Sequence, residues 1–289
     1  MNISQHQQSA RIQATDRRIV HRTPGRKRGP IARLVSPSDL GELIKPFVFL
    51  DHAVFKAGEP RPAMDLLWHP HSGIATVTVV LEGSIRYAET TGKSGVVTTG
   101  GVEWMRASNG VWHTGEAGPE HVRVFQLWVA LPPQLENGHF ASRYMTRDEI
   151  PVVGPARVIL GAFGGAQSPI DAPPLTYLAV TLKAGERWSY QPPTGHDVAW
   201  VAVDKGTLRT PVPVAAGEVA IFESSESSID FVAEGDTVFV LGSAAKHPHD
   251  LVLGSYSVHT SAEALLRGEA EIRHIGQRLL ADGTLQPMA

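Results

Sequence analysis

Two histidines separated by one residue, His69 and His71, stand directly before a run of apolar and β-branched residues, Ile74–Leu81. In an extended chain, side chains two positions apart project to the same face, about 6.6 Å apart along the strand. Both imidazoles can therefore face one ion, and zinc, iron and copper all accept neutral imidazole as a ligand. Such a site needs one or two further ligands from a facing strand, and the sequence offers His113 after a glycine-containing break. Two surface or hydrogen-bonded histidines are the alternative interpretation of the pair.

The composition narrows the ligands that a metal site can use. The chain has 289 residues, with 13 histidines and no cysteine. The absence of cysteine excludes disulfides, thiolate zinc sites, cysteine-ligated iron–sulfur clusters and a cysteine nucleophile. A bound metal must therefore use histidine and carboxylate ligands. The sequence also contains no Gly-x-Gly-x-x-Gly, phosphate-binding loop or nucleophile elbow, which argues against nucleotide enzymes and serine hydrolases.

The elements that must position these residues are predicted to be β-strands. From Pro46 onward, short apolar or β-branched runs alternate with glycine-centred breaks, and helical periodicity is confined to the C-terminal end. The expected strands cover residues 47–50, 74–81, 85–90, 102–106, 122–131, 175–182, 198–203, 207–212, 218–222, 229–232 and 237–241. A connector rich in proline, glycine and alanine, residues 151–174, separates two strand clusters, so two antiparallel β-barrels in tandem are expected. Near the end, Ser261 is expected to cap a helical run over 262–266, with a second run over 270–280.

Charge is distributed unevenly along the chain. The net charge is −3, yet residues 17–33 hold seven arginine and lysine residues and no acid. We interpret this segment as a solvated arm that crosses an acidic body, and we do not expect a nucleic-acid partner. No run approaches the roughly 18 apolar residues that a membrane span requires, and the first fifteen residues are mostly polar. The expectation is a cytoplasmic protein with no membrane partner.

Five segments carry a resemblance to a known family. They are Pro46-Phe47-Val48-Phe49-Leu50-Asp51-His52, His69-Pro70-His71-Ser72-Gly73, Gly100-Gly101-Val102-Glu103-Trp104-Met105, Ser108-Asn109-Gly110-Val111-Trp112-His113 and Gln126-Leu127-Trp128-Val129. In this order and spacing they resemble the pirin family of the cupin superfamily. The resemblance spans residues 31–278 and is more specific in its first half than in its second.

The resemblance implies an all-β bicupin, in which two tandem cupin barrels (double-stranded β-helix, jelly-roll) are followed by short C-terminal helices. The implied division is a polar and basic N-terminal arm (1–30), an N-terminal cupin barrel with the metal site (31–150), a linker (151–174) and a metal-free C-terminal barrel with the terminal helices (175–289). The implied cofactor is Fe²⁺ or another divalent transition metal.

The resemblance carries three of the family's four metal ligands onto His69, His71 and His113. The family reads His-x-Glu at the last ligands, whereas this chain has Gly115 at the carboxylate position and Glu116 one residue further on. In a regular strand, a residue three positions from His113 faces the opposite side. Glu116 can therefore be the fourth ligand only if Gly115 sits in a bulge, which glycine at positive φ permits. A three-histidine site completed by water and a site that has lost its metal are the alternatives.

Two classes of function follow from the resemblance. Family members with quercetin 2,3-dioxygenase activity imply an iron-dependent dioxygenase that acts on a flavonol-like, small aromatic substrate. In that enzyme, Glu116 or Glu103 is the candidate acceptor of the substrate's hydroxyl proton, and Glu103 is more simply interpreted as a rim or strand residue. A eukaryotic member that acts as a transcriptional coregulator implies instead a metal-sensing regulatory protein that binds a protein partner. A degenerate, metal-free cupin is the third alternative.

Overall fold

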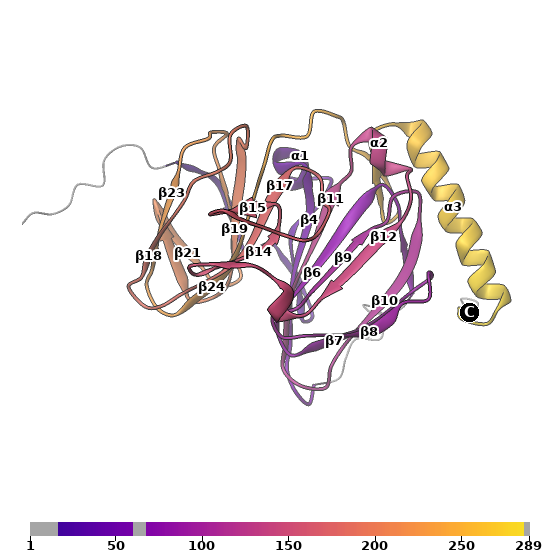
Figure 1. Cartoon of the computed structure of the whole chain (residues 1–289), viewed down its shortest axis with the longest axis horizontal. Coiled ribbons are helices and arrows are strands. Elements are labelled where there is room, and N and C mark those ends of the chain that lie inside the picture. The colour runs from indigo at the N-terminus through magenta and orange to yellow at the C-terminus, as the bar shows by residue number, and fades with distance from the viewer. Residues whose placement is uncertain (1–16, 60–67, 286–289) are drawn as a thin grey trace, which may run out of the picture.

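The computed structural model describes residues 17–59 and 68–285, which form two β-barrels side by side (Figure 1). Each barrel consists of a seven-stranded and a four-stranded antiparallel sheet. The larger sheet of the N-terminal barrel has the spatial order β12 (Ala141–Met145), β9 (Val102–Arg106), β6 (Ile74–Glu82), β11 (Val122–Ala130), β4 (Phe47–Phe55), β3 (Ile31–Val35) and β2 (Arg26–Arg28). The smaller sheet has the order β5 (His69–His71), β10 (Val111–Ala117), β7 (Ser84–Glu89) and β8 (Ser94–Thr98).

The C-terminal barrel repeats this arrangement. Its larger sheet has the order β1 (Ile19–Thr23), β22 (Val219–Phe222), β19 (Val198–Lys205), β24 (Thr237–Ala244), β17 (Leu175–Leu182), β14 (Ala156–Leu160) and β13 (Val152–Val153). The smaller sheet has the order β18 (Arg187–Tyr190), β23 (Ile229–Ala233), β20 (Thr207–Thr210) and β21 (Val212–Ala215). Two hairpins, β15–β16 (Ala162–Phe163 and Ala166–Gln167) and β25–β26 (Val252–Gly254 and Ser257–His259), and the helices α1 (Leu40–Ile44), α2 (Pro133–Glu136), η1 (Arg147–Glu149) and α3 (Ala262–Ala281) complete the fold. The expected pair of antiparallel β-barrels is confirmed.

The two large sheets pack back to back through one hydrophobic core. Val77 of β6 and Phe125 of β11 belong to the same buried cluster as Tyr177 of β17 and Trp200 of β19. Because side chains alternate along a strand, this packing also decides what lines each barrel interior. The neighbours of Val77 on β6 point the other way, into the N-terminal barrel.

The interior of the C-terminal barrel is apolar. A separate buried cluster joins Leu178, Val201, Phe231 and Phe239 from its two facing sheets. Aromatic rings interlock there, since Phe231 lies 5.5 Å from Phe239 and 5.7 Å from Trp188 between ring centroids. Close-packed apolar side chains thus fill the space that in the other barrel contains polar groups.

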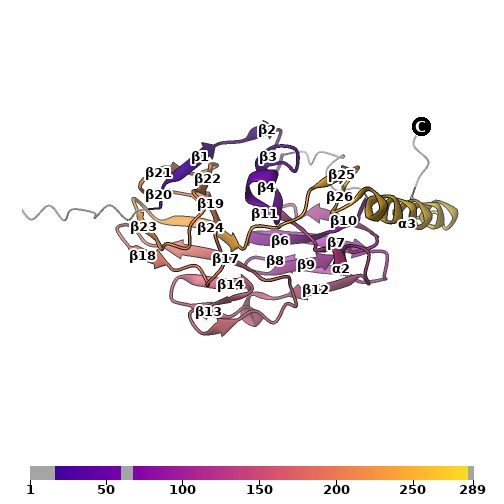
Figure 2. The ribbon, with the colours of Figure 1, turned by 90° about the horizontal axis from the view of Figure 1, so that it is seen from above.

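The chain ends are exchanged between the barrels, which differs from the expected sequential division. Strand β1, expected in a separate arm, pairs with β22 in the C-terminal barrel (Figure 2). The expected linker, residues 151–174, contributes β13 and β14 to the same sheet. Helix α3 follows the C-terminal barrel in sequence but contacts β10 and β5 of the N-terminal barrel. The two expected helical runs form this single helix, and Ser261 caps it by accepting a hydrogen bond from the Ala264 amide at 3.1 Å.

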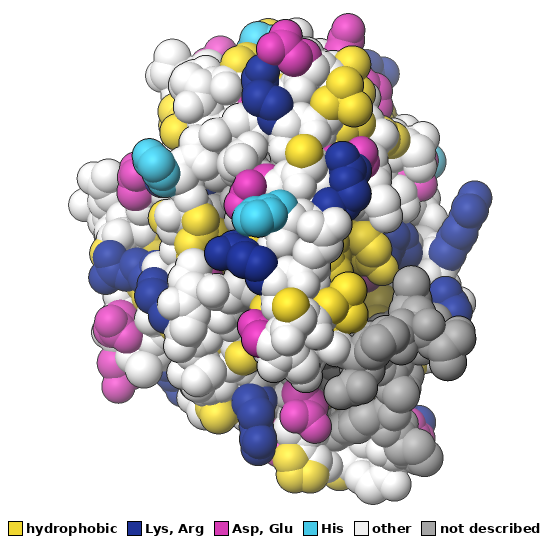
Figure 3. Space-filling view, turned by 90° about the vertical axis from the view of Figure 1, so that its right-hand side faces the viewer, with side chains coloured by type: hydrophobic (Ala, Val, Ile, Leu, Met, Phe, Trp, Pro, Cys, Tyr) yellow, Lys and Arg dark blue, Asp and Glu magenta, His cyan; other side chains and the backbone are white. Residues whose placement is uncertain are grey.

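The basic segment is only partly solvated. Arg17 is 2% exposed, and its guanidinium donates to the carbonyls of Asp197 and Glu223, so the expectation of a solvated arm is wrong at this residue. Arg26–Arg28 form the exposed strand β2. On the face seen in Figure 3, basic and acidic side chains are interspersed. The first fifteen residues, expected to belong to the polar and basic N-terminal arm, lie outside the described residues. No helix within the described ranges is long and apolar enough to cross a membrane.

A buried ionic cluster joins the two barrels at one side of the shared core. Asp204, at the end of β19, lies 2.8 Å from Nε2 of His52 on β4 and accepts hydrogen bonds from Arg123 of β11 at 2.6 and 2.9 Å. The Asp204 side chain is 2% exposed. His52 therefore binds a residue of the other barrel and does not lie among the candidate metal ligands.

We predict that Asp204→Ala destabilises the protein by about 3–5 kcal/mol, because it leaves the buried Arg123 without its counter-ion. Urea unfolding followed by tryptophan fluorescence measures the change. Glu82→Ala is the matched control, since it removes an exposed inter-barrel pair with Lys205 and should cost at most about 1 kcal/mol. Equal effects of the two substitutions would contradict a stabilising role for the buried cluster.

Candidate metal centre

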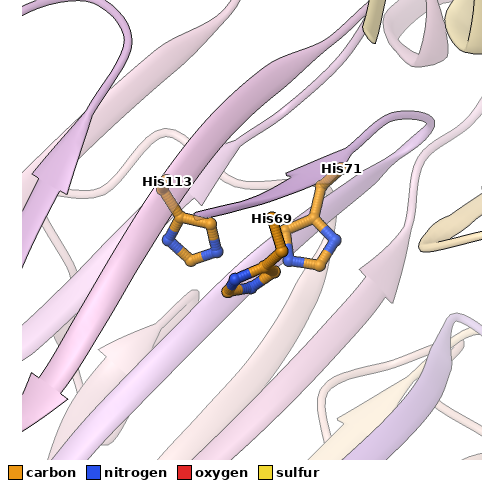
Figure 4. Close-up of side chains that lie close together, drawn as sticks. All are labelled: His69, His71 and His113. Carbon is orange, nitrogen blue, oxygen red and sulfur yellow. The ribbon is translucent and has the colours of Figure 1, made fainter. Parts of the chain in front are cut away.

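Three histidines meet inside the N-terminal barrel at the junction of two paired strands. His69 and His71 lie on β5, and His113 lies opposite His69 on the antiparallel partner β10. One ring nitrogen from each histidine can be chosen so that all three lie within 4.8 Å of one another. Figure 4 shows the three rings pointing toward a common point. The structure therefore brings together the three histidines that the sequence singled out.

Burial keeps His71 in its neutral form. The side chain is almost fully buried, and this burial, followed by the proximity of His69 and His113, holds its pKa well below the ordinary value of 6.5. Its Nδ1 donates a hydrogen bond to the Tyr256 carbonyl at 3.1 Å. Nε2 is therefore the unprotonated nitrogen, and it faces the other two rings (Figure 4).

His113 has nitrogen atoms that the rest of the described chain does not satisfy. The residue is 5% exposed, and neither Nδ1 nor Nε2 has a hydrogen-bond partner among the described residues. A buried polar atom without a partner costs about 1–3 kcal/mol, and a ligand bound at these nitrogens would offset that cost. Three imidazoles form a donor set that suits zinc, iron, nickel or copper. The residues present thus fit a divalent transition metal.

A glycine turn and a distant hairpin hold the loop that follows His71. Gly73 has φ +74°, and a Cβ atom there would lie 2.0 Å from the Val258 carbonyl oxygen. Ser72, which is fully buried, donates a hydrogen bond to Ser257 Oγ at 2.8 Å and lies 3.0 Å from Nε2 of His259. Hairpin β25–β26, which lies against β6 and α3 (Figure 2), is thus bonded to His71 and to the loop that follows it.

Helix α3 adds a second support to the same wall. The indole Nε1 of Trp112, the neighbour of His113, donates a hydrogen bond to the Ile272 carbonyl at 2.7 Å. The amino-acid sequence alone does not predict these supporting contacts. Ser72 and Ser257 are 185 positions apart, and no local pattern connects them.

Glu116 does not join the histidines, which corrects the expectation that it is the fourth ligand. Strand β10 pairs with β7 without a register shift from His113 to Ala117, so no bulge turns the chain at Gly115. Gly115 is not among the glycines with positive φ. Glu116 consequently points outward, is exposed, and lies opposite Arg86. Its expected role as proton acceptor fails for the same reason.

Two other carboxylates lie inside the barrel. Glu103 of β9 and Glu89 of β7 are each 3% exposed. Glu89 accepts hydrogen bonds from Ser142 at 2.6 Å and Tyr144 at 3.1 Å, and it lies opposite His113 across the strand pair. Burial, and then the negative charges of Glu103 and Glu89, raises the pKa of Tyr144. The phenol and both acids therefore share one interior.

Strand alternation could have placed Glu103 correctly. Its neighbour Trp104 belongs to the core between the barrels, so the side chain of Glu103 must face the opposite way, into the barrel. Glu103 is thus a strand residue, as interpreted from the sequence, but an interior residue and not one of the rim.

Aromatic side chains flank one side of the histidines. The ring of Trp128 lies 4.9 Å from that of His71 at 70° and stacks on Phe49 at 4.0 Å. The Arg33 guanidinium lies 3.9 Å from the centroid of Phe49 on that ring's face. The aromatic pair thus forms a wall next to the candidate ligands.

Comparison with known proteins identifies the class of this fold. The family model described as Pirin matches residues 30–129. The structure of a quercetin 2,3-dioxygenase from Acinetobacter baumannii superposes with a TM-score of 0.77 at 23% identity, covering 89% of this chain and 95% of that one. The structure of the Escherichia coli pirin YhhW in complex with nickel(II) gives a TM-score of 0.60 at 18% identity, covering 80% and 98%. The fold is that of a bicupin, as expected.

Sequence relatives narrow the class to a family. A Pseudomonas aeruginosa protein named "Putative quercetin 2,3-dioxygenase PA2418" is 32% identical over 72% of this chain and 77% of its own length. A Caulobacter vibrioides protein named "Pirin-like protein" is 31% identical over 72% of this chain and 76% of its own length. The chain belongs to the pirin family.

We predict that Ser72→Ala lowers the free energy of unfolding by about 1–3 kcal/mol, because Ser257 Oγ and His259 Nε2 each lose a buried partner. Urea unfolding measures this loss. The exposed Ser94 offers a control, and Ser94→Ala should change stability by no more than about 0.5 kcal/mol. If the two variants unfold at the same urea concentration, the hairpin contact does not stabilise the loop.

Proposed function

We propose that this protein is a metal-dependent dioxygenase that acts on a flavonol-like aromatic substrate, with Fe²⁺ or another divalent transition metal held by His69, His71 and His113. The observation that carries the proposal is the convergence of three imidazoles, of which His71 and His113 are buried and His69 is half-buried, with His113 lacking any hydrogen-bond partner among the described residues. The choice of substrate class is supported by the names of a sequence relative, "Putative quercetin 2,3-dioxygenase PA2418", and of a structural neighbour, a quercetin 2,3-dioxygenase.

In this proposal, each residue contributes a defined task. His69, His71 and His113 hold the ion, and the Tyr256 carbonyl keeps His71 in the tautomer whose Nε2 is free to bind. A bound iron(II) supplies Lewis acidity and redox chemistry. Trp128 and Phe49 provide a flat apolar surface that suits an aromatic ring system.

The test is to load the protein with iron(II) without oxygen, remove excess metal, and then add quercetin in air. We expect one iron per chain by elemental analysis, loss of the flavonol absorbance and release of carbon monoxide. His113→Ala should remove both the bound iron and the turnover, because the remaining two imidazoles cannot complete the site. His274→Ala, which alters an exposed histidine on α3, should retain both.

Other outcomes lead to different conclusions. Bound iron without quercetin turnover would contradict the flavonol substrate and favour the metal-sensing regulatory protein with a protein partner. Equal, negligible metal content in the wild type and His113→Ala would contradict the metal site and leave the metal-free cupin. A cytoplasmic location stays a prediction from the sequence.

A further inference from the structure

The group of candidate ligands consists of three histidines without a carboxylate, and this creates an electrostatic problem. Gly115, two residues after His113, has no side chain to contribute, and Glu116 faces outward. Three neutral imidazoles would leave the double charge of a metal ion uncompensated by its own ligands, at a site largely shielded from solvent. Burying a charge without an opposite charge nearby is strongly unfavourable. A carboxylate elsewhere in the interior can supply the compensating negative charge.

Glu103 is anchored at the right place to supply this charge. Thr78 of the neighbouring strand β6 donates a hydrogen bond to Glu103 Oε2 at 2.9 Å. The other carboxylate oxygen, Oε1, is buried and has no hydrogen-bond partner among the described residues. It lies 3.6 Å from Nδ1 of His113. One oxygen thus fixes the side chain while the second faces a candidate ligand.

The two nitrogens of His113 face different neighbours. One points toward His69 and His71, and the other lies on the far side of the ring (Figure 4). Glu103 lies beside Nδ1, so it stands behind the imidazole and not at the ion. A shift of about 0.7 Å would bring the 3.6 Å separation to an ordinary hydrogen-bond length. The arrangement repeats that of His71, whose Nδ1 already donates to a carbonyl.

We propose that Glu103 is the positioning residue of this centre and takes over, from behind His113, the charge compensation that a carboxylate ligand would give. It accepts the Nδ1 proton of His113, which leaves the lone pair of Nε2 for the metal and places a negative charge one imidazole away from it. This inference rests on the proposed function, because it requires a metal at the three histidines.

Glu89 is the other buried carboxylate of this barrel interior described above, and its contacts differ from those of Glu103. It is as buried as Glu103 and also has one oxygen without a partner among the described residues. Its other oxygen, however, is held by two hydroxyl groups, from Ser142 and Tyr144. No ion pair between Glu89 and any of the three histidines is found in the described chain. Glu89 therefore shares the interior without supporting a ligand.

The test compares Glu103→Gln, Glu89→Gln and Glu116→Gln in metal-free protein titrated with Ni²⁺ in a calorimeter. Glu103→Gln keeps the shape but removes the charge, and we expect its nickel affinity to fall about 10- to 100-fold. Glu89→Gln should lose at most a few-fold, and Glu116→Gln should match the wild type. The thermal unfolding midpoint of each metal-free variant is measured in parallel, so that a loss of folding is not mistaken for a loss of binding.

The outcomes separate this inference from the proposed function. If the wild type binds Ni²⁺ and Glu103→Gln binds it equally well, the role of Glu103 is overturned while the metal site stands. Equal losses in Glu103→Gln and Glu89→Gln would also overturn it, since they would indicate a general effect of interior charge. If the wild type binds neither nickel nor iron, the proposed function fails, and the inference fails with it.

Discussion

The pairing of buried polar groups is the constraint on which the N-terminal barrel depends. Its interior contains His71, His113, Glu89 and Glu103, all nearly inaccessible to solvent. A barrel of this size gains most of its stability from apolar packing, so each of these groups must be matched by a hydrogen bond or by a ligand. One oxygen of Glu89 accepts hydrogen bonds from Ser142 and Tyr144, and one oxygen of Glu103 accepts a hydrogen bond from Thr78. Glu103 Oε1 and both ring nitrogens of His113 have no hydrogen-bond partner within the described chain, and these atoms lie at the candidate centre.

The C-terminal barrel has the same arrangement of sheets, but its interior is filled with apolar side chains instead of polar ones. Phe231, Phe239 and their neighbours fill its interior, and it lacks a comparable group of histidines within the described residues. The two large sheets share one core, so each strand of that core presents one face to its neighbour and one to its own barrel. A duplicated framework can therefore support a chemical site in one barrel and serve as a packing platform in the other.

The exchange of chain ends makes the site a property of the whole chain. The hairpin that contacts His71 and Ser72 lies beyond the C-terminal barrel in sequence, and α3 then packs over β10. At the other end of the chain, β1 belongs to the C-terminal barrel, whereas the strands that follow it, β2 to β12, form the N-terminal barrel. The supports of the candidate centre thus come from residues that only complete folding can bring together.

The sequence by itself determined the features that depend on local geometry. Alternation along extended chain placed His69 and His71 on one face, and strand patterns located β9 and β17 to the residue. The sequence also suggested Glu116 as the fourth ligand and interpreted Glu103 as a rim or strand residue. The choice between these two carboxylates depends on whether β10 is bulged and on which strand lies beside His113. Those facts are set by the pairing of β10 with β7 and by the packing of one sheet of the barrel against the other. Only the tertiary structure could place Glu103 behind His113 and the Tyr256 carbonyl behind His71, since each contact joins separate elements whose relative placement is decided by the packing of the whole barrel.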